Sequence, residues 1–190
     1  MRSSGEAIEE WSDERWANLL EAYCRTDYHV ASPVSPLMFH VGELCSEQNL
    51  SLMQAGVFSW CVVTAWNPHS ERRSAEENDL AQAILKADIN AVDLKWWEAA
   101  GRDPAREWPS EESCFVLNIS PQQARSLCRE FEQLAVLYGD AEHEPWLLFG
   151  DWERVRETIA RVSKSGLLSP LVFEQLQGVI AENEDLNAIR

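Results

Sequence analysis

A chain of 190 residues with 45% hydrophobic and 25% charged residues has the composition of a globular protein and is long enough to bury most of the surface that its unfolded form exposes. Its 32 acidic residues outnumber its 16 basic ones, and the formal net charge of −16 repels polyanions and disfavours nucleic-acid binding. The acidic residues are spread along the chain, so we expect a solvated surface; a basic partner or mimicry of nucleic acid are the alternatives.

The start of the chain lacks the pattern of a secretory leader. Residues 1–10 contain neither a basic segment nor an apolar run, and no stretch approaches the ~18 apolar residues of a membrane span. The five cysteines are an odd number, they form no CxxC pair, and three of them lie in apolar runs. We therefore expect reduced core cysteines and a cytoplasmic protein that does not contact a membrane.

The first third of the chain predicts one helix followed by extended segments. Ser12 can cap the helix, whose apolar residues recur at the spacing i, i+3, i+4, i+7 of a helix laid on a core. Extended segments follow at 28–31 and 37–41, and a short helix is expected over 44–55. Residues 57–65 form a nearly unbroken apolar and β-branched run, which is typical of a central strand.

The middle of the chain predicts a capped helix between strands. Ser74 and Glu77 form an S-x-x-E capping box, and apolar residues at helical spacing extend the helix from about 75 to 90. A strand is expected around 94–97, and 114–119 reads as a second buried strand.

The next helix begins with Ser120 and Pro121, which supply a cap and a proline at the first helical position, and it should end near Glu132. An apolar strand follows at 134–138, and 146–149 is a candidate hairpin partner for it. No glycine-rich turn supports a dinucleotide-binding fold.

The C-terminal part predicts a helical hairpin, with one helix starting at Asp151 and another at Pro170. Strands and helices in this order predict the α+β class: a largely antiparallel sheet with helices packed on one side, plus the C-terminal hairpin. We divide the chain into a core domain over 1–150 and the hairpin over 151–190. The hairpin is expected to pack on the core, although a dimer contact fits its periodicity equally well.

A polar block begins where the strand at 57–65 ends. It contains Asn67, the adjacent pair Arg72 and Arg73, and then Glu77 and Asn78. Backbone N–H groups at a helix start attract anions, so a small anionic ligand could bind there beside the two arginines. The structural alternative is that these residues make a turn, a helix cap and neutralising ion pairs. Asn78 has no capping role and therefore remains a candidate functional residue.

A second polar stretch, residues 101–113, leads into the strand at 114–119 and contains Trp108, Glu111 and Glu112. Neighbouring residues on an extended chain point to opposite sides, so only one of the two glutamates can face a pocket and act as a base. A solvated turn with Trp108 packed as a lid is the alternative.

Several motifs in order resemble a family of bacterial proteins catalogued as domain of unknown function 3293. They are Ala22-Tyr23 with Thr26-x-Tyr28, Thr64-Ala65-x-Asn67-Pro68-x-Ser70, Glu77-Asn78, Trp108-Pro109-x-Glu111-Glu112-Ser113 with Val116-Leu117, and Phe131-x-Gln133-x-Ala135. The resemblance covers roughly Tyr23 to Gly139, and it implies a grouping and no activity. The usual pattern has Gly before and Asn after the Gln, where this chain has Glu132 and Leu134. Gln133 is expected to satisfy nearby backbone groups.

The familiar catalytic and metal-binding templates are absent from the sequence. The four histidines are scattered without the spacing of zinc ligands, and there is no GxSxG motif or P-loop. We therefore expect no metal and no cofactor. The candidate ligand-binding residues are Asn67, Arg72, Arg73, Glu77, Asn78, Trp108 and Glu112.

Two functions remain open. The favoured one is a binding or regulatory module that engages a protein partner or a small anionic ligand, and the C-terminal helices are the candidate surface for the partner. The alternative is a small hydrolase or transferase acting on an anionic substrate, in which the two arginines hold the anion and Glu77 or Glu112 is the general base. The enzyme hypothesis requires that carboxylate to meet Asn67 and Asn78 in one cleft.

Overall fold

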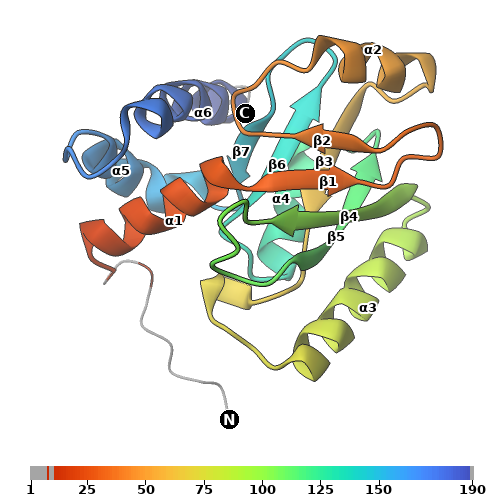
Figure 1. Ribbon diagram of the computed structural model, residues 1–190, viewed down its shortest axis with the longest axis horizontal. Helices are drawn as coiled ribbons and strands as arrows, with labels where there is room; N and C mark the ends of the chain where they lie inside the picture. The colour runs from red at the N-terminus through yellow and green to blue at the C-terminus, as the bar shows by residue number, and fades with distance from the viewer. Residues whose placement is uncertain (1–7, 9–10, 189–190) are drawn as a thin grey trace.

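In the part of the chain that the structure describes, seven antiparallel strands form one sheet in the order β2-β1-β4-β5-β3-β6-β7 (Figure 1). The computed structural model describes residue 8 and residues 11–188. The strands are β1 Asp27–Val30, β2 Leu37–Phe39, β3 Ser59–Val63, β4 Trp96–Arg102, β5 Glu111–Leu117, β6 Ala135–Asp140 and β7 Trp146–Phe149. The helices are α1 Asp13–Arg25, α2 Ser46–Gln54, the 3-10 turn η2 Pro68–Ser70, α3 Ala75–Ala91, α4 Pro121–Glu130, α5 Trp152–Ser163 and α6 Pro170–Ala188. The predicted α+β class with an antiparallel sheet is confirmed.

Helix starts follow the predicted capping chemistry. The Ser12 side chain accepts a hydrogen bond from the Arg15 backbone N–H at the start of α1. Ser74 and Glu77 form the predicted capping box of α3, in which each side chain satisfies the backbone N–H of the other residue. These contacts span three residues, so the local sequence is enough to specify them.

The sheet is curled, so that its edge strand β2 lies over its middle. The rings of Phe39 on β2 and Trp60 on β3 have centroids 4.4 Å apart, although three strands lie between β2 and β3 in the sheet order. A backbone hydrogen bond of 2.7 Å from Gly42 to Pro145 links the two edges of the curl. We call the side that carries Phe39 and Trp60 the concave face.

Gly139 makes room for the buried side chain of Trp60 on the concave face. It pairs with Trp60 across β3 and β6, and a Cβ atom on it would lie 2.3 Å from the Trp60 ring. Trp60 in turn stacks on Phe115 with centroids 4.9 Å apart. The aromatic interior of the curl therefore depends on a glycine at this position.

The opposite, convex face is covered by α3 and α4. Cys61 and Cys114 point to this face and are fully buried, and Cys128 joins them from α4. All five cysteines are free thiols, and burial raises the pKa of Cys114 and of Cys128 to about 12. Cys61, Cys114 and Cys128 are therefore core residues and not reactive groups.

The C-terminal hairpin of α5 and α6 packs on the edge strand β7 and against α1 (Figure 1). Asn183 of α6 is fully buried and faces the open edge of β7. Its Nδ2 donates to the carbonyl of Leu147 at 2.8 Å, and its Oδ1 accepts from the N–H of Phe149 at 3.2 Å. One side chain thus pairs with the strand edge that no neighbouring strand covers.

No helix in the described part of the chain is long and apolar enough to cross a membrane. The prediction that residues 1–10 carry no secretory leader lies outside the described residues, apart from Ile8.

Candidate functional site

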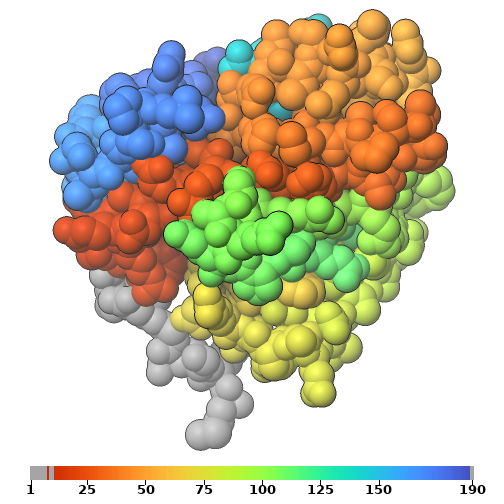
Figure 2. Space-filling model, viewed as in Figure 1, coloured from red at the N-terminus to blue at the C-terminus, as the bar shows by residue number. Residues whose placement is uncertain are grey.

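A cavity of about 290 Å³ opens at one end of the concave face. Its walls come from three parts of the chain: α1, the residues 66–73 that we call loop 66–73, and the connection between β4 and β5. Figure 2 shows these segments meeting on one face of the molecule, in red, yellow and green. The floor is apolar and consists mainly of Val62, Ala135, Leu137 and Leu147.

Glu111 places a carboxyl group in this cavity. It is the first residue of β5 and pairs with Gly101 on β4, and both residues line the cavity. Glu111 Oε1 accepts a 2.6 Å hydrogen bond from Asn67 Nδ2. Within the described residues this is its only hydrogen-bond donor, and no cationic side chain pairs with it. Burial raises the pKa of Glu111, and the hydrogen bond from Asn67 offsets part of the rise.

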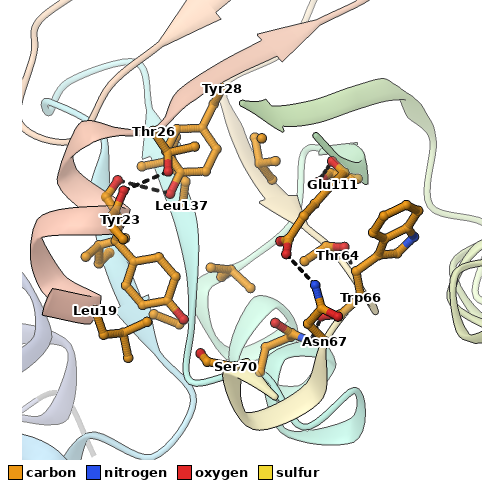
Figure 3. A pocket seen from close by; sticks show the side chains of 18 of the residues that line it. Leu19, Tyr23, Thr26, Tyr28, Thr64, Trp66, Asn67, Ser70, Glu111 and Leu137 are labelled. Atoms are coloured by element: carbon orange, nitrogen blue, oxygen red, sulfur yellow. Dashed lines mark hydrogen bonds between the residues drawn. The ribbon is translucent and has the colours of Figure 1, made fainter. Parts of the chain in front are cut away.

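Asn67 is held rigidly by Asn78 of α3. The Asn78 side chain accepts from the Asn67 backbone N–H at 2.9 Å and donates to Asn67 Oδ1 at 3.1 Å. The Arg73 backbone N–H also donates to Asn67 Oδ1, at 3.0 Å. With its oxygen occupied in this way, Asn67 must turn its NH₂ group toward Glu111 (Figure 3).

Loop 66–73 has an unusual backbone that its surroundings hold in place. Asn67, His69 and Ser70 have φ angles of 49°, 55° and 58°, in the left-handed region that non-glycine residues rarely adopt. Gln133 Nε2 donates to the carbonyls of Trp66 and Phe131, which confirms the expectation that Gln133 satisfies nearby backbone groups. Backbone strain maintained in this way is common at functional sites.

Tyr23 reaches the cavity from α1, on the side opposite Glu111 (Figure 3). Burial raises the pKa of its phenol, and the Ser70 side chain offsets part of that shift. Tyr28 on β1 adds an aromatic ring, and its hydroxyl donates to the Tyr23 carbonyl at 3.3 Å. The cavity therefore has one carboxyl group, two phenol rings and an apolar floor.

Three of the seven candidate residues line the cavity: Asn67, Arg72 and Trp108. Arg72 is exposed at the rim and forms no ion pair with a described residue. Trp108 is half-buried in the β4–β5 connection, and the guanidinium of Arg25 lies 5.2 Å from its ring centroid. Asn67 and Arg72 come from the polar block, and Trp108 comes from the second polar stretch.

The other four candidates lie elsewhere. Glu77 is tied into the cap of α3, and Arg73 pairs with Glu71 at 3.6 Å. Asn78 is buried behind Asn67 and acts through it. Glu112 points to the convex side and pairs with Lys86 of α3. Neither carboxylate assigned as a base in the enzyme hypothesis reaches the cavity.

The polar stretch at 101–113 is partly strand, because β4 extends to Arg102 and β5 begins at Glu111. Both glutamates thus lie on β5 and alternate between the two faces of the sheet. Alternation alone could not decide which one enters a pocket, because the strand is covered on both sides. Tyr23, Ser70 and Gln133 belong to the motifs of the family resemblance but were not singled out as ligand contacts.

Replacing Glu111 with glutamine is expected to raise the thermal stability at neutral pH. The pKa of Glu111 is higher in the folded protein than in the unfolded chain, so Glu111 loses its proton at a lower pH in the unfolded chain. The free energy of unfolding therefore falls as the pH rises from the ordinary pKa of 4.5 through the folded pKa. Glutamine cannot ionise and escapes this loss. About 1 kcal/mol corresponds to roughly 2–4 °C in Tm for a chain of this size.

Thermal unfolding at a series of pH values measures this difference. The Tm of Glu111→Gln should exceed that of the wild type at neutral pH, and the two should converge below 4.5. Glu112→Gln is the matched control, because it makes the same change at the neighbouring carboxylate, which lies outside the cavity and pairs with Lys86. Equal Tm values for Glu111→Gln and the wild type at all pH values would show that the buried carboxylate costs no stability.

Comparison with known families finds a match for part of the chain. Residues 63–136 match the family model described as Protein of unknown function (DUF3293). The resemblance expected from the motifs is thus confirmed for this segment, which contains Asn67, Asn78, Glu111 and Gln133. No curated protein and no solved structure matches the chain.

Proposed function

We propose that this protein is a binding module that holds a small molecule in the cavity around Glu111. The observation that carries the proposal is a largely apolar cavity of about 290 Å³ into which one carboxyl group is directed without a cationic partner from the described residues. Small-molecule sites commonly combine an apolar lining with a few well-placed polar groups.

The rigidity of the polar groups supports this proposal. Asn78 and Gln133 hold loop 66–73, and Asn67 holds Glu111, so the groups that would contact a ligand are ordered before it binds. Preorganisation of this kind lowers the entropy cost of binding. A cavity formed only by imperfect packing would not require such support.

The burial of the C-terminal helices favours a small-molecule ligand in the cavity over a protein partner bound to the hairpin. The apolar residues of α5 and α6 are buried within the chain, among them Ile159 and Leu176. What remains exposed on the hairpin is mainly polar, with Leu167, Leu171 and Phe173 as the larger apolar exceptions. The predicted protein partner and the predicted anionic ligand both remain predictions, and the experiment below tests the second.

A thermal-shift series with three compound classes tests the proposal: n-alkylamines, sugar phosphates and nucleosides. A compound at 100 times its Kd stabilises the native state by about 2.7 kcal/mol, which is several degrees in Tm. Ala22→Phe should abolish the shift, because Ala22 lines the cavity on α1 and a phenyl ring would fill it. Asn18→Phe, on the exposed side of α1, is the matched control and should retain the shift.

The proposal fails if no compound of the three classes raises the Tm of the wild type. It also fails if Ala22→Phe responds as strongly as Asn18→Phe, because binding would then occur outside the cavity. Circular dichroism of both variants establishes beforehand that each one folds.

The raised pKa of Glu111 favours a second candidate, a hydrolase or transferase in which Glu111 is the general base. Arg72 at the rim would then attract an anionic substrate. With p-nitrophenyl phosphate as the probe, Glu111→Gln should lower turnover by about 10²–10⁴-fold, the usual contribution of a general acid or base. Equal release of p-nitrophenol by the wild type and by Ala22→Phe would reject this candidate.

A further inference from the structure

The electrostatic balance of the cavity indicates the charge of its ligand. Among the described residues, Glu111 is the only acidic residue in the lining, and Arg72 is the only basic one. Arg72 is exposed at the rim and forms no ion pair with Glu111. The interior of the cavity therefore carries an uncompensated carboxyl group.

The carboxyl group also has unused hydrogen-bonding capacity. A carboxylate accepts about four hydrogen bonds, and among the described residues only Asn67 donates to Glu111. Glu111 and its partner on β4, Gly101, both line the cavity, so the carboxyl group borders its open space. A ligand that donates hydrogen bonds can therefore reach the group directly.

The remaining walls suit a cation attached to an apolar body. Tyr23 and Tyr28 present aromatic rings, which attract cations through their faces. Leu137 and Leu147 in the floor provide apolar contact. An anion, by contrast, would enter against the charge of Glu111 and against a protein of net charge −16.

We propose that the ligand of this cavity is a small organic amine, bound with its ammonium group on Glu111 and its apolar part on the floor between Tyr23 and Leu147. This inference rests on the proposed binding function and adds the chemical class of the ligand. The cavity volume of about 290 Å³ lies near the lower end for ligand sites, so the amine is small.

Three probes of similar shape and different charge test the inference: n-hexylamine, 1-hexanol and hexanoate, each titrated by calorimetry into the wild type and into Glu111→Gln. The amine should bind the wild type most tightly. Glu111→Gln should weaken the amine by about 10–100-fold, the range for a hydrogen bond between charged groups, and should leave hexanol nearly unchanged. Glu112→Gln, on the opposite face, should bind all three probes like the wild type.

The pH dependence provides an independent readout. The other titratable groups of the lining are Tyr23 and Tyr28, whose pKa values burial raises, and Arg72, so Glu111 is the lining group that changes charge in the acidic range. Amine affinity should fall on acidification in the wild type. In Glu111→Gln it should not change.

Several outcomes would overturn the inference. Hexanol or hexanoate binding as tightly as the amine, or amine affinity that Glu111→Gln does not change, rejects the ligand class but leaves the cavity as a binding site. The absence of saturable binding by any of the three probes also rejects the ligand class. The broader compound series with Ala22→Phe then decides separately whether the cavity binds anything at all.

Discussion

Replacement of Asn183 with leucine is expected to lower the free energy of unfolding by about 2–6 kcal/mol, since two buried backbone groups lose their partners at about 1–3 kcal/mol each. These groups are the carbonyl of Leu147 and the N–H of Phe149, which Asn183 pairs on the open edge of β7. Leucine has a similar volume, so the change isolates the hydrogen bonds from the packing. Urea unfolding of both proteins measures the difference.

Gln177→Leu serves as the control, because Gln177 is an exposed residue on the same helix. Surface changes of this kind usually alter stability by no more than about 0.5 kcal/mol. If Asn183→Leu unfolded at the same urea concentration as this control, the pairing of α6 with the sheet edge would not contribute to stability.

The second large effect is expected for Asn78→Leu, which removes the residue that orients Asn67. The variant leaves the Asn67 backbone N–H and side-chain oxygen without their partner on α3, at a cost of about 2–3 kcal/mol for part-buried groups. It also removes one of the two hydrogen bonds that hold Asn67 Oδ1, so the Asn67 side chain turns away from Glu111 more readily. Since that hydrogen bond lowers the pKa of Glu111, the variant should raise it further.

Two measurements follow the two consequences of Asn78→Leu. Urea unfolding reports the loss of stability, and a carbon-13 NMR titration of the Glu111 carboxyl reports its pKa in each protein. Asp79→Leu, at the exposed neighbouring position, should change neither quantity appreciably. A Glu111 pKa that is the same in Asn78→Leu and in the wild type would contradict the chain of contacts from Asn78 through Asn67 to Glu111.

The candidate site was only partly predictable, and Glu111 and Glu112 illustrate the reason. The sequence places two carboxylates side by side at the start of a strand, where alternation sends them to opposite faces. Which face holds a cavity depends on the curl of the sheet and on α1, which lies about 90 positions earlier in the chain. Lys86 forms an ion pair with Glu112 on the helix-covered face, and Asn67 donates a hydrogen bond to Glu111 on the other face.

The sequence by itself determined the elements that are stabilised by contacts between residues close together in the chain. The caps at Ser12, Ser74 and Ser120 join residues three positions apart, and apolar runs identify the buried strands, so the α+β class followed from the chain alone. The tertiary structure decided the cavity, the role of Asn78 and the pairing of Asn183 with β7. Each of these requires contacts between residues that are distant in sequence, and local propensity carries no information about them.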